Sequence, residues 1–99
     1  MELTGKQKRH LRGLAHHLKP VVLVGTAGIS EALIGHVTDA LEDHELIKMK
    51  CGENAPLTIK EAAAKVAEQT GCAVAGTIGR TAILYKRRAE DPEIELPKA

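Results

Sequence analysis

A short segment bounded by glycines, Gly25-Thr26-Ala27-Gly28, has the composition and position of a ligand-binding turn. It follows an apolar run of strand length and precedes Ser30, a residue type that often caps a helix. Glycines let a ligand approach the backbone closely, and the free amides at a helix N-terminus favour an anion such as phosphate. The same turn also arises for purely steric reasons, so phosphate binding here is a hypothesis.

The second candidate site is a set of cations on one face of a predicted helix near the start of the chain. At 100° per residue they fall within an arc of roughly 100° that excludes the leucines of this helix. Some of them lie four positions apart, where like charges repel, and no acid occurs among residues 6–19. An ordinary solvated face is the alternative, but an anionic partner would offset the repulsion. The residues are Lys8, Arg9, Arg12, His16 and Lys19, with Lys6 close by.

A third candidate is an arginine at a predicted turn between the last two strands. Arg80 follows Gly79, and a guanidinium beside a glycine turn can reach a phosphate, although it can also be simply exposed. A basic run at 86–88 follows the second of these strands. These residues extend the set of candidate phosphate contacts.

Residues that could support catalysis or bind a metal form no established pattern. Cys51 and Cys72 belong to no CxxC pair, and the histidines include no HxxxH pair. Ser30 lacks the Gly-x-Ser-x-Gly context of a nucleophile elbow and is better explained as a helix cap. We therefore expect no cofactor, no structural zinc and no enzyme activity, with two reduced thiols in a cytoplasmic protein.

Composition argues against two further classes of protein. Tyr85 is the only aromatic residue, so base stacking on aromatic rings, as in RNP motifs and OB-folds, is not available in its usual form. The apolar run at 21–24 is far shorter than the roughly 20 residues of a membrane span, and the N-terminal segment lacks the apolar region of a signal peptide. We expect no membrane partner, and any nucleic acid would be bound through charge, backbone amides and shape.

The elements that must position these candidates are also predictable. Two capping boxes, Thr4 with Gln7 and Thr58 with Glu61, mark helix starts, and Ser30 caps a further helix. Apolar residues recur with a period of 3.6 in the helices and of 2 in the alternating strands. The first helix is expected at 5–18, the others begin after Ser30 and Thr58, and the strands are expected at 21–24, 46–51, 72–78 and 81–86.

The order α-β-α-β-α-β-β predicts an α/β fold, a mixed four-stranded sheet with helices packed on it. The run at 21–24 is expected to be buried on both faces. The strand at 46–51 alternates and is expected to have one face nearer to water; the alternative is that its lysines only protect a sheet edge. The 99 residues are expected to form one domain at 1–88 and an acidic, loosely held tail at 89–99.

Charge is unevenly distributed although the net charge is only +1. Residues 6–19 and 80–88 carry cations without acids, whereas 31–45 carry acids without Lys or Arg. This pattern predicts a bipolar molecule whose basic pole could bind an anion. Two other functions use the same features: a small phosphate-ligand enzyme at the turn, or a protein-binding adaptor that uses the acidic second helix.

The segments KQKRHLRGLAHHLKPVVLVGTAGIS, HELIKMKC and TIGRTAILYKR together resemble the CRM domain (chloroplast RNA splicing and ribosome maturation). The similarity is to its stand-alone bacterial form, the YhbY family. It runs from about Leu3 to Arg88 and includes the LKPVV segment, the GxxG turn and the ELIK strand.

The resemblance implies a fold similar to the C-terminal domain of translation initiation factor 3. It also implies RNA as the partner, without DNA specificity, and association with ribosomal RNA in large-subunit precursors. Within the turn, Thr26-Ala27 departs from the basic or polar residues common in RNA-clamping loops, so the first helix and Arg80 must supply the charge. The oligomeric state is left open. The expected RNA-binding residues are Lys6, Lys8, Arg9, Arg12, His16, Lys19, Gly25, Thr26, Ala27, Gly28 and Arg80.

Overall fold

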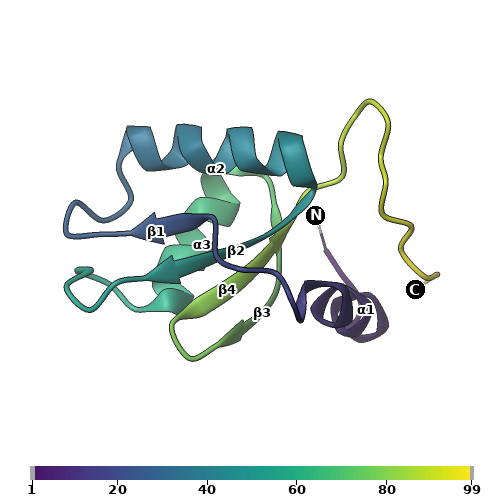
Figure 1. The fold of residues 1–99 in the computed structure, drawn as a ribbon, viewed down its shortest axis with the longest axis horizontal. Coiled ribbons are helices and arrows are strands. Elements are labelled where there is room, and N and C mark those ends of the chain that lie inside the picture. The colour runs from purple at the N-terminus through teal and green to yellow at the C-terminus, as the bar shows by residue number, and fades with distance from the viewer. Residues whose placement is uncertain (1, 99) are drawn as a thin grey trace.

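The computed structural model describes residues 2–98 and contains, within them, three helices and one four-stranded sheet (Figure 1). The predicted order α-β-α-β-α-β-β is confirmed. The elements are α1 (Gly5–Ala15), β1 (Val22–Val24), α2 (Glu31–His44), β2 (Leu46–Cys51), α3 (Ile59–Thr70), β3 (Ala73–Ile78) and β4 (Thr81–Tyr85).

The sheet is mixed, as predicted, with the strand order β1-β2-β4-β3. β1 and β2 are parallel and are connected through α2, whereas β2 with β4 and β3 with β4 are antiparallel. The tight turn between β3 and β4 is at Gly79-Arg80, and Gly79 has φ +57°. A bulge between Val74 and Gly76 shifts the register of β3.

Local hydrogen bonds explain where the helices begin. Thr4 Oγ1 accepts from the Gln7 N–H and the Gln7 side chain accepts from the Thr4 N–H, both at 3.1 Å. Thr58 and Glu61 form the second capping box at the start of α3. Ser30 Oγ accepts from the backbone N–H of the third residue of α2 at 3.1 Å. Each cap satisfies a backbone donor that the helix itself leaves unpaired, so the three predicted starts are confirmed.

Two expectations about α1 and β1 are wrong. α1 ends at Ala15 rather than at residue 18, but Leu18 still packs against the cluster of buried residues beneath α1. β1 is not buried on both faces, because Leu23 is 63% exposed between the buried Val22 and Val24. The reason is that β1 is an edge strand, with α2 on one face and no helix over Leu23 on the other.

β2 has one face nearer to water, as expected, but the alternative that its lysines protect a sheet edge is wrong. β2 lies between β1 and β4, so Lys48 and Lys50 are not edge residues. They alternate with the buried Ile47 and Met49, as predicted. Their side chains therefore lie on the face of the sheet opposite α2 and α3.

The sheet divides the apolar core into two layers. α2 and α3 cover one face, where Val22, Val37, Met49, Val66 and Leu84 are among the buried residues. α1 covers part of the other face, over a smaller cluster of Leu11, Ala15, Leu46, Ala75, Ile83 and Tyr85. Each fully buried aliphatic side chain contributes about 1.5–3 kcal/mol, so even the smaller layer holds α1 firmly in place.

The acidic C-terminal segment, expected from its composition to be loosely held, contacts the domain through Glu45. This residue follows α2 with φ +61° and is 1% exposed. Its carboxylate accepts hydrogen bonds from the backbone N–H groups of Arg88, Glu93 and Ile94. Ile94 and Leu96 pack against the cluster beneath α1. A buried carboxylate is therefore the anchor of this segment.

Candidate nucleic-acid interface

The cations predicted on the first helix lie on α1 or in the segment that follows it. Lys6 and Arg9 are exposed on the helix, and Lys8 is half-buried beside β3. His16 and Lys19 are exposed between α1 and β1. The first turn of α1 holds no acid, so these charges are not neutralised by neighbours on the helix itself.

Arg12 differs from the other cations of α1 because it is tied to the sheet. Its Nη1 donates to the carbonyl of Ala75 at 3.1 Å, and a Cβ on Gly76 would lie only 3.0 Å from Arg12 Cδ. The arginine stem thus lies against the bulge of β3, where Gly76 leaves room for it. Arg12 is still exposed, so it both fixes α1 on the sheet and presents positive charge to solvent.

The predicted turn connects β1 to α2, and its two glycines have different surroundings. Gly28 is buried, its N–H donates to the Gly25 carbonyl at 3.0 Å, and it has φ +66°. A Cβ on Gly28 would lie 3.2 Å from Pro56, so local packing explains this glycine. Gly25 is exposed, and a Cβ there would meet nothing within 4 Å. Gly25 is therefore the position where another molecule could approach the backbone.

Arg80 is close to this turn. The Arg80 carbonyl accepts from Cys51 N–H at 2.8 Å, and Gly52 N–H donates to the Val24 carbonyl at 2.9 Å. The ends of β1, β2 and the β3–β4 hairpin therefore meet at one end of the sheet. Arg80 also lies 4.0 Å from Glu53, an exposed pair that screening by water makes weak.

The structure separates the predicted residues into two groups. Gly25–Gly28 and Arg80 lie at one end of the sheet, and α1 with its cations lies toward the other end of the long axis (Figure 1). Between them lie Lys48 and Lys50, which sequence reasoning missed as binding residues. Their alternation with apolar residues is the available signal, but only the pairing of Lys48 with Ile83, which packs beneath α1, shows that they lie on the face that carries α1.

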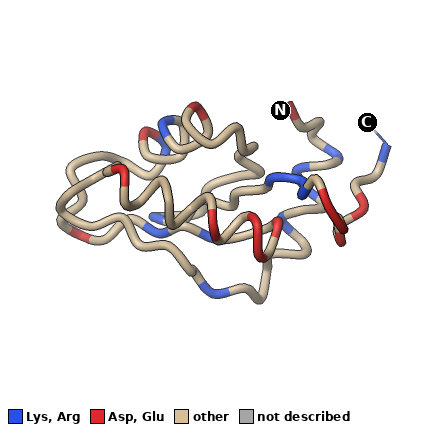
Figure 2. Tube along the Cα trace, turned by 90° about the horizontal axis from the view of Figure 1, so that it is seen from above, with Lys and Arg blue, Asp and Glu red and all other residues tan. Residues whose placement is uncertain are grey.

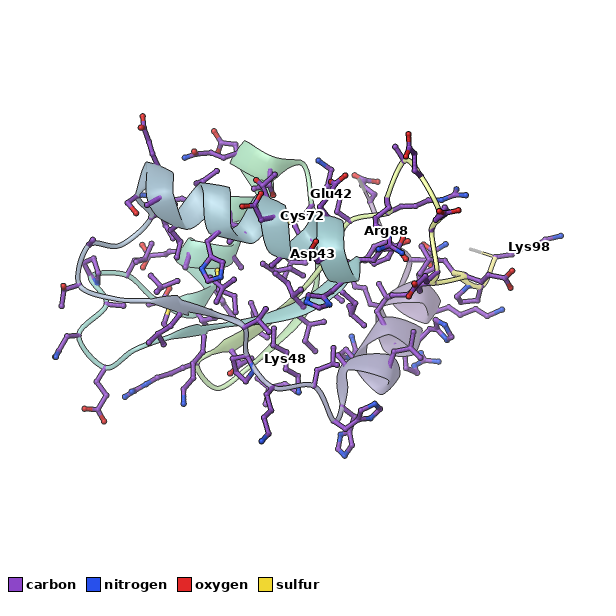
Figure 3. The ribbon with its side chains drawn as sticks, turned by 45° about the horizontal axis from the view of Figure 1, so that its top comes forward. Glu42, Asp43, Lys48, Cys72, Arg88 and Lys98 are labelled. Atoms are coloured by element: carbon purple, nitrogen blue, oxygen red, sulfur yellow. The ribbon has the colours of Figure 1, made fainter. Side chains whose placement is uncertain are left out.

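The basic run at 86–88, a further candidate from the sequence, has a structural role. Lys86 Nζ donates to the Thr70 carbonyl at 2.7 Å, at the end of α3. Arg88 Nη1 donates to the carbonyls of Glu42 and Asp43 in the last turn of α2. Figure 3 shows the Arg88 side chain near this end of α2. Cations at helix C-termini satisfy unpaired carbonyls and complement the helix dipole.

The sheet separates the acidic α2 from the cations of α1. Acidic residues follow α2 and the C-terminal segment in Figure 2. In Figure 3, Lys48 lies on the side of the sheet away from Glu42 and Asp43. The cations of α1 and the acidic α2 therefore lie on opposite faces of the sheet, whereas the acidic C-terminal segment packs on the α1 side.

The remaining chemistry-bearing groups are occupied or buried. The Ser30 hydroxyl caps α2, and Glu31 already places an acid in the first turn, which opposes an anion there. Burial raises the pKa of the Cys51 and Cys72 thiols, which disfavours the nucleophilic thiolate. Within residues 2–98, no group of three or more His, Cys, Asp or Glu residues is arranged to hold a metal ion. None of the helices in that range has the length and apolar character to cross a membrane.

The fold and the surface define a class of small α/β domain, in which helices cover one face of the sheet fully and the other, basic face only in part. Residues 3–86 match the model of the CRS1 / YhbY (CRM) domain, and this chain belongs to that family. The Bacillus subtilis protein named "Probable RNA-binding protein YqeI" is 41% identical over 95 residues, which cover 96% of this chain and 99% of that protein.

Two further similar proteins cover nearly the whole chain. A Haemophilus influenzae protein named "RNA-binding protein" is 40% identical over 96 residues, covering 97% of this chain and 96% of that protein. The solution structure of a Staphylococcus aureus protein superposes with a TM-score of 0.82 at 42% identity, covering 97% of this chain and 100% of the other. The family expected from the sequence and its fold are both confirmed.

Proposed function

We propose that this protein is a non-catalytic RNA-binding module whose basic face, formed by α1 and the sheet end that carries Gly25–Gly28 and Arg80, binds the phosphate backbone. The observation that carries the proposal is the set of cations on α1 and the segment after it, where residues 6–19 contain no acid, while the acidic α2 lies on the opposite face of the sheet. Polyanion binding through lysine and arginine needs such a one-sided surface. The relatives named RNA-binding proteins support RNA as the polyanion.

The site residues in this proposal are those expected from the sequence, with unequal roles. Lys6, Arg9 and Lys19 are exposed and available to phosphates. Lys8 and Arg12 lie nearer the sheet, and the Thr26-Ala27 pair adds a hydroxyl and backbone amides without charge. Gly25 provides a close approach to the backbone. Arg80 extends the surface to the hairpin.

The finer part of the proposal is that the RNA is ribosomal and the bound particle is a precursor of the large ribosomal subunit, in the cytoplasm. Support comes from the similarity of the three segments to the YhbY form of the CRM domain. Sedimentation of cell extracts on sucrose gradients, with the protein detected in each fraction, tests this part. We expect the protein with large-subunit precursors, and its presence only at the top of the gradient would contradict the ribosomal assignment.

RNA binding itself is tested by charge reversal with a matched control. The variant with Lys6→Glu and Arg9→Glu changes two exposed residues of α1, and we expect RNA affinity to fall at least tenfold, or about 1.4 kcal/mol. The control, Lys60→Glu with Lys65→Glu, makes the same change in net charge on exposed positions of α3. Fluorescence anisotropy with labelled RNA measures both, and equal losses would contradict a localised interface.

A phosphate-ligand enzyme at the β1–α2 turn is disfavoured by the structure of that turn. The hydroxyl of Ser30 is engaged as a helix cap, and Glu31 opposes an anion at the start of α2. The turn therefore lacks a free nucleophile and a strong anion site, whereas the adjoining sheet face is cationic.

A further inference from the structure

The strand register aligns four residues in a row across the whole sheet. Leu23 pairs with Lys50, Lys50 pairs with Thr81, and Thr81 pairs with Ile78. Directly paired residues of neighbouring strands point to the same face, so this row points to the face that α1 covers elsewhere. The row lies beside the β1–α2 turn and the Gly79-Arg80 turn, because its members are within two residues of the strand ends there.

α1 leaves this row open. Farther along the same face, Leu46 and Tyr85 are 5% and 0% exposed beneath α1. In the open row, by contrast, Leu23 is 63% and Ile78 is 67% exposed, and Lys50 is exposed as well. One half of this sheet face is thus core and the other half is surface.

The open half is also hollowed next to the row. A cavity of about 170 Å³ is lined by Pro20, Lys48, Ile78, Thr81 and Ile83. Lys48 Nζ lies 3.4 Å from the His16 carbonyl, which holds it between the end of α1 and the open row. The open half therefore has a lysine at its centre and a second lysine where it meets α1.

We propose that this open half of the sheet is a further part of the RNA-binding site, where a sugar–phosphate backbone crosses the sheet between α1 and the β1–α2 turn. The inference rests on the proposed RNA-binding function and adds the path of the ligand. Lys50 neutralises a phosphate at the centre of the row, with Lys48 on the α1 side. Leu23 and Ile78 contact the apolar faces of sugars or bases at its two ends.

The pattern of the row favours a nucleic-acid backbone over an apolar protein segment. The two apolar residues are separated by a lysine and a threonine, so they do not form one continuous apolar patch. None of the four residues in the row is acidic, and at the rim the exposed Glu53 lies 4.0 Å from Arg80. A backbone in which each phosphate is flanked by sugars matches a row with a lysine between two apolar ends.

The path also explains how two separated groups of candidate residues can serve one ligand. The cations of α1 and the turn with Arg80 lie toward opposite ends of the same face. Because Tyr85 is 0% exposed, the face offers no aromatic ring for base stacking. This face is therefore expected to recognise the RNA backbone. Lys48 and Lys50 of β2 link the cations of α1 to the turn that carries Arg80.

The test is the variant Lys50→Glu, with Lys60→Glu on α3 as the matched control. Both positions are exposed, so both variants should keep the melting temperature of the parent. We expect Lys50→Glu to weaken binding to a labelled RNA at least fivefold and Lys60→Glu to change it less than twofold. Lys50→Ala should also reduce the slope of log affinity against log salt concentration by about 0.7, the value for one phosphate contact on a single strand.

The outcomes separate this inference from the proposed function. If Lys50→Glu binds RNA as tightly as the parent while the Lys6→Glu, Arg9→Glu variant has lost binding, the path across the sheet is wrong and the proposed function stands. If the parent itself shows no RNA affinity, both are wrong. If Lys50→Glu fails to fold, Lys50→Ala and its salt slope decide, and an unchanged slope overturns the inference.

Discussion

The two glycines of the β1–α2 turn show how residues of one type can serve different purposes. Gly28 has φ +66° and contacts Pro56, so the fold itself requires it. Gly25 has open space where a side chain would be, and no positive φ. The fold gives no steric reason for a glycine at 25, which makes close approach by a ligand the better explanation.

This difference gives a paired prediction at the residue scale. Gly25→Ala should leave the free energy of unfolding unchanged or raise it by about 0.4–1 kcal/mol, because alanine restricts the unfolded chain. RNA affinity should fall severalfold, since a methyl group would occupy the approach to the backbone. Gly28→Ala should instead cost about 1–2 kcal/mol of stability through its left-handed backbone. Denaturant unfolding and anisotropy measure the two effects, and full RNA affinity of Gly25→Ala would assign the turn a connecting role only.

At the scale of elements, Glu45 joins the end of α2 to the C-terminal segment. A non-glycine residue with positive φ costs on the order of 1–3 kcal/mol, and the three backbone N–H groups on its carboxylate offset that strain. Burial alone would raise the pKa of Glu45, but these donors and the Arg88 guanidinium outweigh it and hold the pKa below the ordinary value of 4.5. The charged form is thus the one that the fold stabilises.

The sign of the pH dependence follows from this lowered pKa. The contribution of Glu45 is fully present above pH 4.5, the ordinary glutamate value, and is lost as the pH falls through the lower pKa of the folded state. Glu45→Gln should lower the free energy of unfolding at neutral pH by about 1.5–3 kcal/mol and flatten its decline below pH 4.5.

The matched control for this prediction is Glu42→Gln, an exposed position in the last turn of α2, the helix that Glu45 follows. Urea unfolding from pH 3 to 7, followed by the fluorescence of Tyr85, measures both variants. Tyr85 is a suitable probe because it is the only aromatic residue and lies beside Ile94 and Leu96 of the C-terminal segment. Equal pH dependence in the parent and Glu45→Gln would contradict the role of Glu45 as the anchor.

The elements that the sequence predicts well are those decided by near neighbours. Caps at Thr4, Ser30 and Thr58 depend on residues three positions away, so each helix start is visible in the chain. The order of the strands depends on contacts such as Leu46 with Tyr85, far apart in sequence. The local sequence pattern holds no information about that pairing, so the sequence alone does not show that β1 is the edge strand and that β2 is internal.

The same reasoning limits prediction of the candidate site. Charge patterning marks the cations of α1, but the hydrogen bond from Arg12 to Ala75 depends on how α1 lies over β3. Lys50 is visible as an alternating lysine, yet its place in an open row needs the registers of both neighbouring strands. Residues 86–88 look like a binding segment in sequence, and only the helix ends beside them explain Lys86 and Arg88.

At the scale of the whole molecule, the sheet both builds the core and separates the charges. One face is completed by α2 and α3, while α1 completes only part of the other and leaves Leu23, Lys50 and Ile78 exposed. A molecule of net charge +1 can therefore present a cationic surface on one side. Such an asymmetric field orients a polyanion before contact and disfavours binding to the acidic side.

The central claim, that RNA binds the α1 side of the sheet, is tested most directly by titrating RNA into the isotope-labelled protein and mapping the backbone amide shifts by NMR. We predict the largest shifts along α1, at the β1–α2 turn, around Lys50 and at the Gly79-Arg80 turn, with small shifts over the exposed residues of α2. Shifts concentrated on α2 and the C-terminal segment, with the α1 side unchanged, would contradict the account.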